Sequence, residues 1–190
     1  LGALRGLDIE DYDSQEQYVE FHYKPRQDLP LKNNWGGERA VGLPEDVCAV
    51  LDEYIEHQRF DKYDEYGQRP LLTSQNGRAS KNAIRVWMNL ATQPCLHIDC
   101  PHGKERDTCG WVDYSHASKC PSSRSPHHIR TGSITWQLNR GIPQEVVAER
   151  VNTSVRTLKE HYDQPTNIEA LEERRREHID RLDFNEEEDE

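Results

Sequence analysis

Four of the five cysteines fall between residues 95 and 120, in a segment with few apolar residues and no sustained hydrophobic period. A segment this poor in apolar side chains buries too little surface to offset the entropy of ordering it, so something other than burial must hold it. No secretion signal is visible in the sequence, and cysteines in such a chain favour metal binding over disulfides. We therefore interpret residues 95–120 as an insert that needs a bound metal ion to become ordered.

Zinc is the metal that this insert predicts. Zinc takes four sulfur or nitrogen ligands in a tetrahedron, and such a site can order a loop that cannot fold alone. The predicted ligands are Cys95, Cys100, Cys109 and Cys120, with His102 as the first candidate to replace one of them. Their spacing differs from that of standard zinc fingers, and the alternative is a loop of reduced, unligated thiols. The predicted role is that of a scaffold for the helix that follows.

Apolar periodicity divides the rest of the chain between helices and one small sheet. Residues 1–9 read as the end of a helix, and residues 18–24 and 38–43 as two paired strands. A helix is expected over residues 44–59, with Val47 and Val50 among its core-facing positions, and another over 80–91, capped by Ser80. The fold class predicted is mainly α with a small antiparallel β-sheet, an α+β fold.

Residues 125–163 contain the candidate catalytic residues His127, Arg130 and Tyr162. A helix is expected to begin at Ser125-Pro126 and to end before Gly141, with Trp136 among its candidate core residues. His127 and Arg130 are three residues apart, so they share one face of this helix. Two further helices should follow, over 143–150 and from Ser154 onward, and the second of these carries Tyr162.

His, Arg and Tyr together have the chemistry to attack a phosphodiester. A guanidinium is a permanently charged fork that matches two phosphate oxygens, and an imidazole can donate a proton. A phenol with a pKa of about 10 needs help to become a nucleophile, and nearby positive charge supplies it. An H-x-x-R pair alone is more often a surface ion-pair face, so the Tyr decides the interpretation.

The stretch 125–163 resembles the C-terminal half of the catalytic domain of tyrosine recombinases, the phage-integrase family, and the cysteine-rich insert resembles that of haloarchaeal members. The resemblance implies a catalytic domain over residues 1–163, with the insert at 95–120, and a charged C-terminal helix and tail over 164–190. It implies catalytic roles for Tyr162, Arg130, His127, Lys32 and Thr153. Arg174 falls in the C-terminal part, which reads as a solvated tail whose apolar positions include Ile168, Ile179 and Leu182.

Three features of the chain differ from the family pattern or leave a choice open. The family has His, or sometimes Trp, nine residues before the nucleophile, where this chain has Thr153. Lys32 is the best match to the family's hairpin lysine, with Lys24 as the competitor. The leading catalytic Arg of the family would lie before Leu1, so we expect the 190-residue chain to be inactive.

The function that the resemblance implies is site-specific DNA recombination or integration. The tyrosine would cleave and rejoin double-stranded DNA through a 3′-phosphotyrosine intermediate, without a divalent metal, in a homo-oligomer that is a tetramer on DNA. One alternative is a non-catalytic, zinc-containing helix-turn-helix DNA-binding protein that uses residues 143–163. Another is a purely structural zinc-bearing interaction protein. Both alternatives should tolerate Tyr162→Phe.

Charge gives a mixed indication. The formal net charge is -11, from 24 basic and 35 acidic residues, and the basic set holds 7 Lys against 17 Arg. An acidic, lysine-poor surface is similar to that of proteins from salt-loving archaea, although an ordinary acidic cytoplasmic protein fits too. DNA binding normally needs a basic footprint, so a local basic pocket is required. No apolar run reaches eighteen residues, so we expect no membrane span and a cytoplasmic protein.

Overall fold

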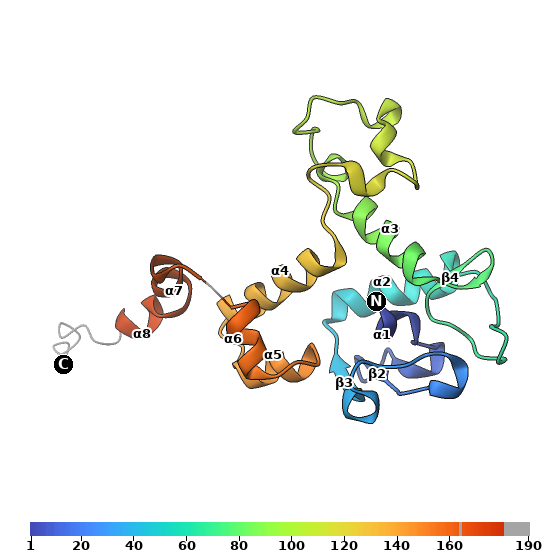
Figure 1. The fold of residues 1–190 in the computed structure, drawn as a ribbon, viewed down its shortest axis with the longest axis horizontal. Helices are drawn as coiled ribbons and strands as arrows, with labels where there is room; N and C mark the ends of the chain where they lie inside the picture. The colour runs from blue at the N-terminus through green and yellow to red at the C-terminus, as the bar shows by residue number, and fades with distance from the viewer. Residues whose placement is uncertain (164, 181–190) are drawn as a thin grey trace, which may run out of the picture. The chain divides into compact units, whose positions relative to one another are not determined.

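The computed structural model describes residues 1–163 and 165–180, which form two compact units, one over Leu1–His128 and the other over the described residues from Ile129 onward (Figure 1). The division falls inside one helix, α4 (Pro126–Asn139), and each unit has its own hydrophobic core. The domain boundary expected between residues 163 and 164 stays a prediction. Leu182 and the acidic end of the chain lie outside the described residues.

A three-stranded antiparallel sheet organises the first unit. Its strands β1 (Tyr12–Asp13), β2 (Tyr18–Phe21) and β3 (Arg39–Gly42) lie in the order β1-β2-β3, which confirms the predicted pairing. Val19 faces Val41 across β2 and β3, and side chains alternate between faces, so Val19 and Phe21 point into the core. The buried cluster consists of Leu7, Val19, Phe21, Leu31 and Leu71. A short helix, α1 (Gly2–Arg5), precedes the sheet.

Helix α2 (Glu45–Glu53) continues into a π-helical turn, Tyr54–Gln58, close to the predicted bounds. Two positions of its predicted core-facing side are wrong, because Val47 is 40% and Val50 67% exposed. Cys48 is buried and Ile55 packs against the core of the first unit, and the Cys48 carbonyl oxygen accepts a hydrogen bond from the Tyr12 hydroxyl at 3.1 Å. One turn further along, Asp52 accepts from the same hydroxyl at 2.9 Å. A polar anchor on β1 therefore sets the rotation of α2.

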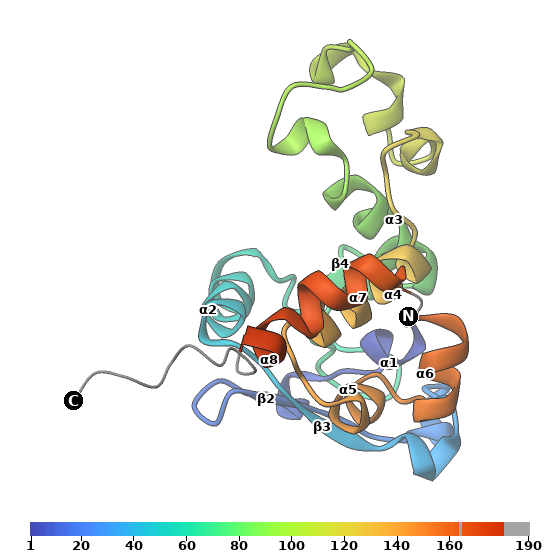
Figure 2. The ribbon, with the colours of Figure 1, turned by 90° about the vertical axis from the view of Figure 1, so that its left-hand side faces the viewer.

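Helix α3 (Lys81–Ala91) begins as predicted at Ser80, whose Oγ accepts a hydrogen bond from the Ala83 amide at 3.0 Å. A hairpin of β4 (Thr73–Ser74) and β5 (Gly77–Arg78) precedes it. The insert leads away from the last turn of α3 (Figure 2). It is built from short 3-10 turns at Pro94–Leu96, Arg106–Thr108, Gly110–Val112 and Ala117–Lys119.

Buried charges cross-link the first unit. Arg78 donates to Asp8 at 2.5 Å and to Asp64 at 2.7 Å, and its side chain is 6% exposed. Lys24 pairs with Asp8 at 2.7 Å and with Asp11 at 2.6 Å. Since residues 8, 24, 64 and 78 come from separate segments, these pairs hold the loops around the sheet in one arrangement.

The second unit consists of helices. Helices α4, α5 (Gln144–Arg150) and α6 (Val155–His161) enclose a core of Ile134, Leu138, Val147, Ala148 and Leu158. Gly141, at φ +76°, follows the end of α4, as the sequence predicts. Helices α7 (Asn167–Arg174) and α8 (Arg176–Asp180) come next. The observed fold confirms the predicted class, mainly helical with small antiparallel sheets.

Some predicted apolar contacts of the second unit are wrong. Trp136 is 55% exposed and lies under the guanidinium of Arg140, 4.4 Å from the ring centroid. Ile134 and Leu138, four residues apart, supply the buried face of α4, and Trp136 lies between them in sequence on another side. Ile168 and Ile179 are exposed too, but they lie in the C-terminal part that the sequence predicts to be solvated. No helix within the described residues is long and apolar enough to cross a membrane.

Candidate functional site

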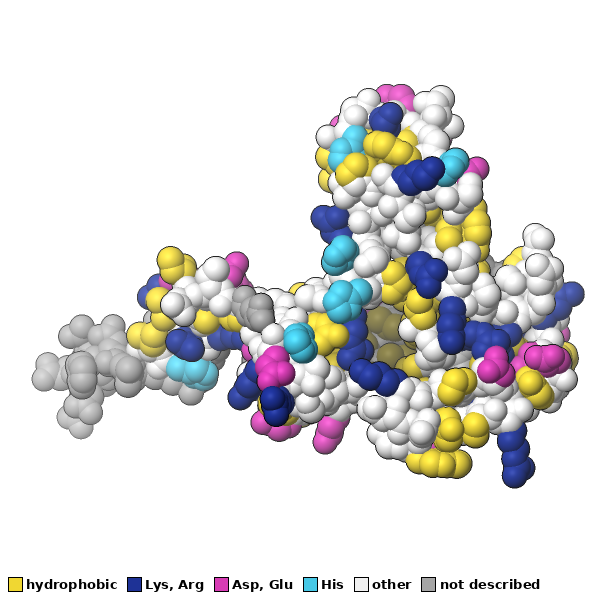
Figure 3. Space-filling view, viewed as in Figure 1, with side chains coloured by type: hydrophobic (Ala, Val, Ile, Leu, Met, Phe, Trp, Pro, Cys, Tyr) yellow, Lys and Arg dark blue, Asp and Glu magenta, His cyan; other side chains and the backbone are white. Residues whose placement is uncertain are grey.

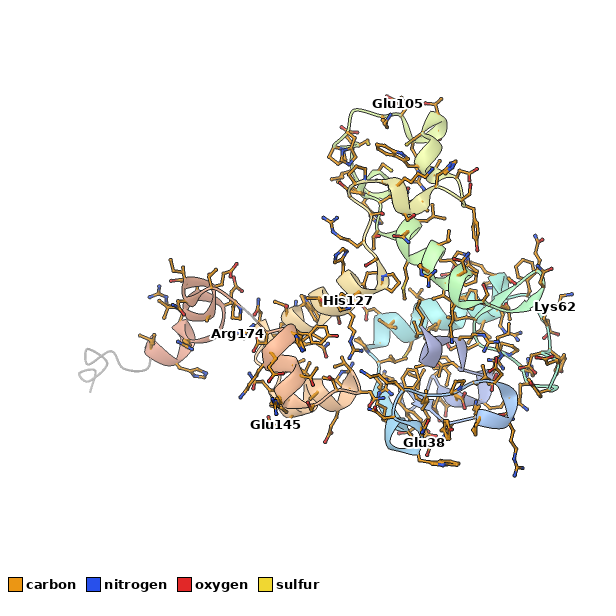
Figure 4. The ribbon with its side chains drawn as sticks, in the orientation of Figure 1. Glu38, Lys62, Glu105, His127, Glu145 and Arg174 are labelled. Atoms are coloured by element: carbon orange, nitrogen blue, oxygen red, sulfur yellow. The ribbon has the colours of Figure 1, made fainter. Side chains whose placement is uncertain are left out.

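The first turn of α4 carries His127. The helix starts where predicted, with the His128 amide donating to Ser125 Oγ at 3.4 Å. His127 is exposed at the N-terminal end of the helix, where Figure 4 labels it. Arg130 follows three residues later, so the two side chains leave the helix on the same side. The helix N-terminus also favours a negatively charged ligand at this end.

Arg130 is the centre of the candidate site in the second unit. Its Nη2 donates a hydrogen bond to the Val151 carbonyl at 2.6 Å. Its guanidinium carbon lies 5.5 Å from the centre of the Tyr162 ring, within the range of a cation–π contact. One side chain of α4 therefore contacts both the turn that precedes α6 and the tyrosine at its end.

Thr153 belongs to that turn. Its amide donates to the Ala148 carbonyl at 2.9 Å, which closes the C-terminal end of α5. Asn152 adopts a left-handed conformation with φ 51°, and Ser154 then caps α6 by accepting from the Thr157 amide at 3.0 Å. Thr153 is thus placed by backbone geometry, two residues from the carbonyl that Arg130 holds.

Tyr162 ends α6 and lies against the core. Its amide donates to the Leu158 carbonyl at 2.9 Å, and its ring packs on the cluster that contains Leu158. The tyrosine also lines an open pocket of about 510 Å³. The other lining residues are Thr131, Thr135, Asn139, His161, Pro165, Glu169 and Glu173. The ring is therefore anchored on one side and accessible on the other.

The two candidate lysines lie in the first unit and differ in their surroundings. Lys32 is exposed in the segment between β2 and β3, next to the buried Leu31. Lys24 is 15% exposed and is held between the carboxylates of Asp8 and Asp11. An amine held by two carboxylates is tied to the fold, so Lys24 is poorly placed to reach a ligand, and Lys32 stays the predicted catalytic lysine.

The predicted zinc ligands are not assembled. Cys48, Cys95, Cys100, Cys109 and Cys120 are all free thiols. In the parts of the chain that the structure describes, no three His, Cys, Asp or Glu side chains are grouped as a metal site requires. The arrangement therefore does not fit zinc as it stands, and zinc binding stays a prediction from the sequence.

Polar contacts around Gln93 join separate segments of the insert. Gln93 is 1% exposed, and its Nε2 donates to the Trp111 carbonyl at 2.8 Å. Arg106 donates to Gln93 Oε1 at 3.3 Å and to the Cys95 sulfur at 3.1 Å. The Lys104 ammonium lies 4.9 Å from the Trp111 ring centre. Hydrophobic side chains are visible on the surface of the insert (Figure 3). Ile98, also in the insert, is 67% exposed.

The sequence missed a polar cluster directly beside Tyr162. Asp163 pairs with Arg174 at 2.6 Å and accepts a hydrogen bond from Gln144 Nε2 at 3.2 Å. Arg174 also donates to Asn139 Oδ1 at 2.9 Å, and its side chain is only 19% exposed. The expectation of a solvated tail was therefore wrong for Arg174. No sequence spacing links these four residues, and the only available signal was the position of Asp163 next to the tyrosine.

Comparison with known proteins identifies the fold. No family model matches the chain, and no curated protein sequence does. The structure of XerA recombinase matches with a TM-score of 0.60 and 17% identity, over 95% of this chain and 52% of that chain. The Tn1549 transposon integrase in complex with transposon right end DNA matches with a TM-score of 0.60 and 16% identity, over 95% of this chain and 54% of that one.

A second structure of that integrase, in complex with circular intermediate DNA, matches with a TM-score of 0.56 and 16% identity, over 96% of this chain and 55% of that one. The chain thus has the fold found in these recombinase and integrase structures. It spans about half the length of each of these solved chains.

Proposed function

We propose that this chain is the catalytic part of a tyrosine recombinase or integrase that acts on double-stranded DNA. The contact of Arg130 with both the Tyr162 ring and the Val151 carbonyl carries the proposal. This contact brings a guanidinium, which can bind phosphate, next to a phenol, which can act as a nucleophile. The fold that carries them is shared with DNA-bound integrase structures. Arg130 and Tyr162, which the sequence analysis assigned to one site, are in contact.

The proposed reaction is a transesterification. The Tyr162 phenolate oxygen attacks a DNA phosphorus, the bond to the 5′ oxygen breaks, and a 3′-phosphotyrosine forms. Arg130 would hold non-bridging oxygens as their negative charge develops, assisted by His127 and Thr153. Lys32 would deliver the proton that the leaving 5′ oxygen takes up. The reverse reaction rejoins the strand, so the chemistry requires neither a divalent metal nor an external energy source.

Double-stranded DNA as partner, and a homo-oligomer that is tetrameric on DNA, belong to the same proposal. The chain is acidic overall, so DNA contact has to rest on local positive charge. Arg130 and the N-terminal end of α4 provide such a local centre. The acidic, lysine-poor composition supports a halophilic origin, in which the protein remains dissolved in concentrated salt.

A nicked suicide duplex tests the proposal. The full-length protein should form a covalent adduct with the 3′ end of the cleaved strand, and the adduct should be absent in Tyr162→Phe. Tyr54→Phe is a control of the same chemistry, since Tyr54 lies on the π-helical turn of the first unit. No adduct at either low or high salt would contradict the proposal. A regulator that only binds DNA would retain binding in Tyr162→Phe and yield no adduct in any form.

A further inference from the structure

Four segments of the second unit meet at Asp163, the residue that follows Tyr162. Asn139 is the last residue of α4, Gln144 the first of α5, and Arg174 the last of α7. Gln144 and Arg174 each bind one oxygen of the Asp163 carboxylate, and Arg174 also binds Asn139. Helix α7, whose last residue Arg174 is labelled in Figure 4, is therefore tied to the segment that carries the tyrosine.

The ion pair of Asp163 and Arg174 is buried, so its geometry matters for stability. The Asp163 side chain is 7% exposed, so an unpaired charge there would be strongly unfavourable. Arg174 Nη2 is buried without a partner among the described residues, which is itself a cost. An apolar contact would dock α7 without that cost. A buried ion pair with defined geometry is better explained by the position that it imposes on its neighbours.

The backbone passes this constraint to the tyrosine. The amides of Tyr162 and Asp163 both donate to the Leu158 carbonyl at 2.9 Å, so the last turn of α6 ends in one tight bifurcated arrangement. Fixing the Asp163 side chain fixes the peptide that joins it to Tyr162. The ring of Tyr162 is held by Arg130 and the core, and its backbone by Asp163.

We propose that Asp163 and Arg174 are positioning residues for Tyr162, so that α7 of the same chain holds the nucleophile in its reactive place. This inference rests on the proposed function, because it concerns the rate at which Tyr162 attacks DNA. Small displacements of a reacting group have large effects on rate, about a hundredfold for 1 Å. Breaking the pair should therefore slow adduct formation more than it weakens DNA binding.

The test compares Asp163→Asn, Arg174→Gln and Arg174→Lys with the matched control Arg176→Gln. Arg176 lies two residues after Arg174 and pairs with Glu172 on an exposed surface. In the full-length protein, single-turnover adduct formation at saturating duplex should fall about tenfold to a hundredfold in Asp163→Asn and Arg174→Gln. Duplex affinity should stay within about twofold in both, because neither residue is required for binding. Arg174→Lys should recover part of the rate, and Arg176→Gln should match the wild type.

Hydrogen exchange provides a readout that does not depend on catalysis. In the 190-residue chain, amides of residues 158–163 should exchange faster in Asp163→Asn and Arg174→Gln, while those in α3 of the first unit should not change. Unchanged exchange together with an unchanged rate would overturn the positioning role. Faster exchange in a protein whose wild type forms no adduct would leave the positioning intact and overturn the proposed function. Equal losses of rate and duplex affinity would also overturn the positioning role.

Discussion

Arg130 donates a hydrogen bond to the Val151 carbonyl and lies 5.5 Å from the centre of the Tyr162 ring. One guanidinium thus sets the distance between α4, the turn before α6 and the tyrosine at the end of α6. In the proposed recombinase, the same group that would bind the phosphate also shapes the surface on which the phosphate lies.

Arg130→Lys should reduce adduct formation by about 10²–10³ in the full-length protein. Lysine keeps the charge but loses the planar fork, so it cannot bind two phosphate oxygens in the same geometry. Single-turnover cleavage of the suicide duplex measures this loss. Arg156→Lys is the matched control, because Arg156 forms an exposed pair with Glu160 on α6. A rate within twofold of the wild type would exclude Arg130 from the site.

Thr153→Val should lower the same rate by about tenfold, the value of one lost hydrogen bond to a charged oxygen. Valine keeps the shape of threonine, and the Thr153 amide bond to Ala148 does not involve the side chain. The thermal unfolding midpoint should therefore stay the same. A full rate in Thr153→Val would show that the hydroxyl does not contact the phosphate.

Arg78→Ala should destabilise the first unit by about 3–5 kcal/mol, because it leaves the carboxylates of Asp8 and Asp64 buried without this partner. Urea unfolding of the 190-residue chain measures the change. Arg156→Ala should cost less than about 1 kcal/mol, since that pair is exposed. Equal costs for the two variants would mean that the buried network adds nothing to stability.

Stability should fall in acid, in part through Asp64. Burial alone would raise the pKa of Asp64, but hydrogen bonds from Arg78 and from the amides of Gln68 and Tyr66 outweigh it and lower the pKa. A lowered folded-state pKa contributes stability above the unfolded value of about 3.9, and this stability is lost as the pH falls through the folded value. The free energy of unfolding, measured with urea between pH 6 and pH 3, should therefore fall less steeply with pH in Asp64→Asn than in the wild type. An identical slope would contradict this assignment.

Zinc in the insert remains a prediction that metal analysis can decide. The sequence predicts one zinc per chain, with Cys95, Cys100, Cys109 and Cys120 protected from thiol reagents until a chelator is added. After purification without added metal, elemental analysis measures the zinc content and titration with a thiol reagent measures how many cysteines are protected. A metal-free chain whose thiols react at once would instead agree with the arrangement held by Gln93 and Arg106.

Local signals located most of the fold. The caps at Ser80 and Ser154 and the turn at Gly141 mark the predicted helix ends, and alternation located β2 and β3. The buried faces were harder to predict. The orientation of α2 depends on Tyr12, which lies far away in sequence, so Val47 and Val50 were wrongly placed inside.

The candidate site, too, could be predicted only where it does not depend on how distant segments pack. The residue types, their spacing and the resemblance to tyrosine recombinases together selected Arg130 and Tyr162, because phosphate chemistry needs a guanidinium fork and a nucleophile. The contact with Val151 and the pairing of Asp163 with Arg174 depend on how α4, α5, α6 and α7 pack, and no periodicity records that. The cysteine insert was predicted from composition, yet the contacts around Gln93 came only with the structure.

The ion pairs around Asp8 are buried, and dissolved ions screen buried pairs far less than exposed ones. Binding to a nucleic acid backbone, by contrast, weakens steeply as salt concentration rises. If the chain is the recombinase proposed above, added salt would leave the interior network at nearly full strength and weaken binding to DNA. Ionic strength would then set the time spent on DNA without unfolding the protein.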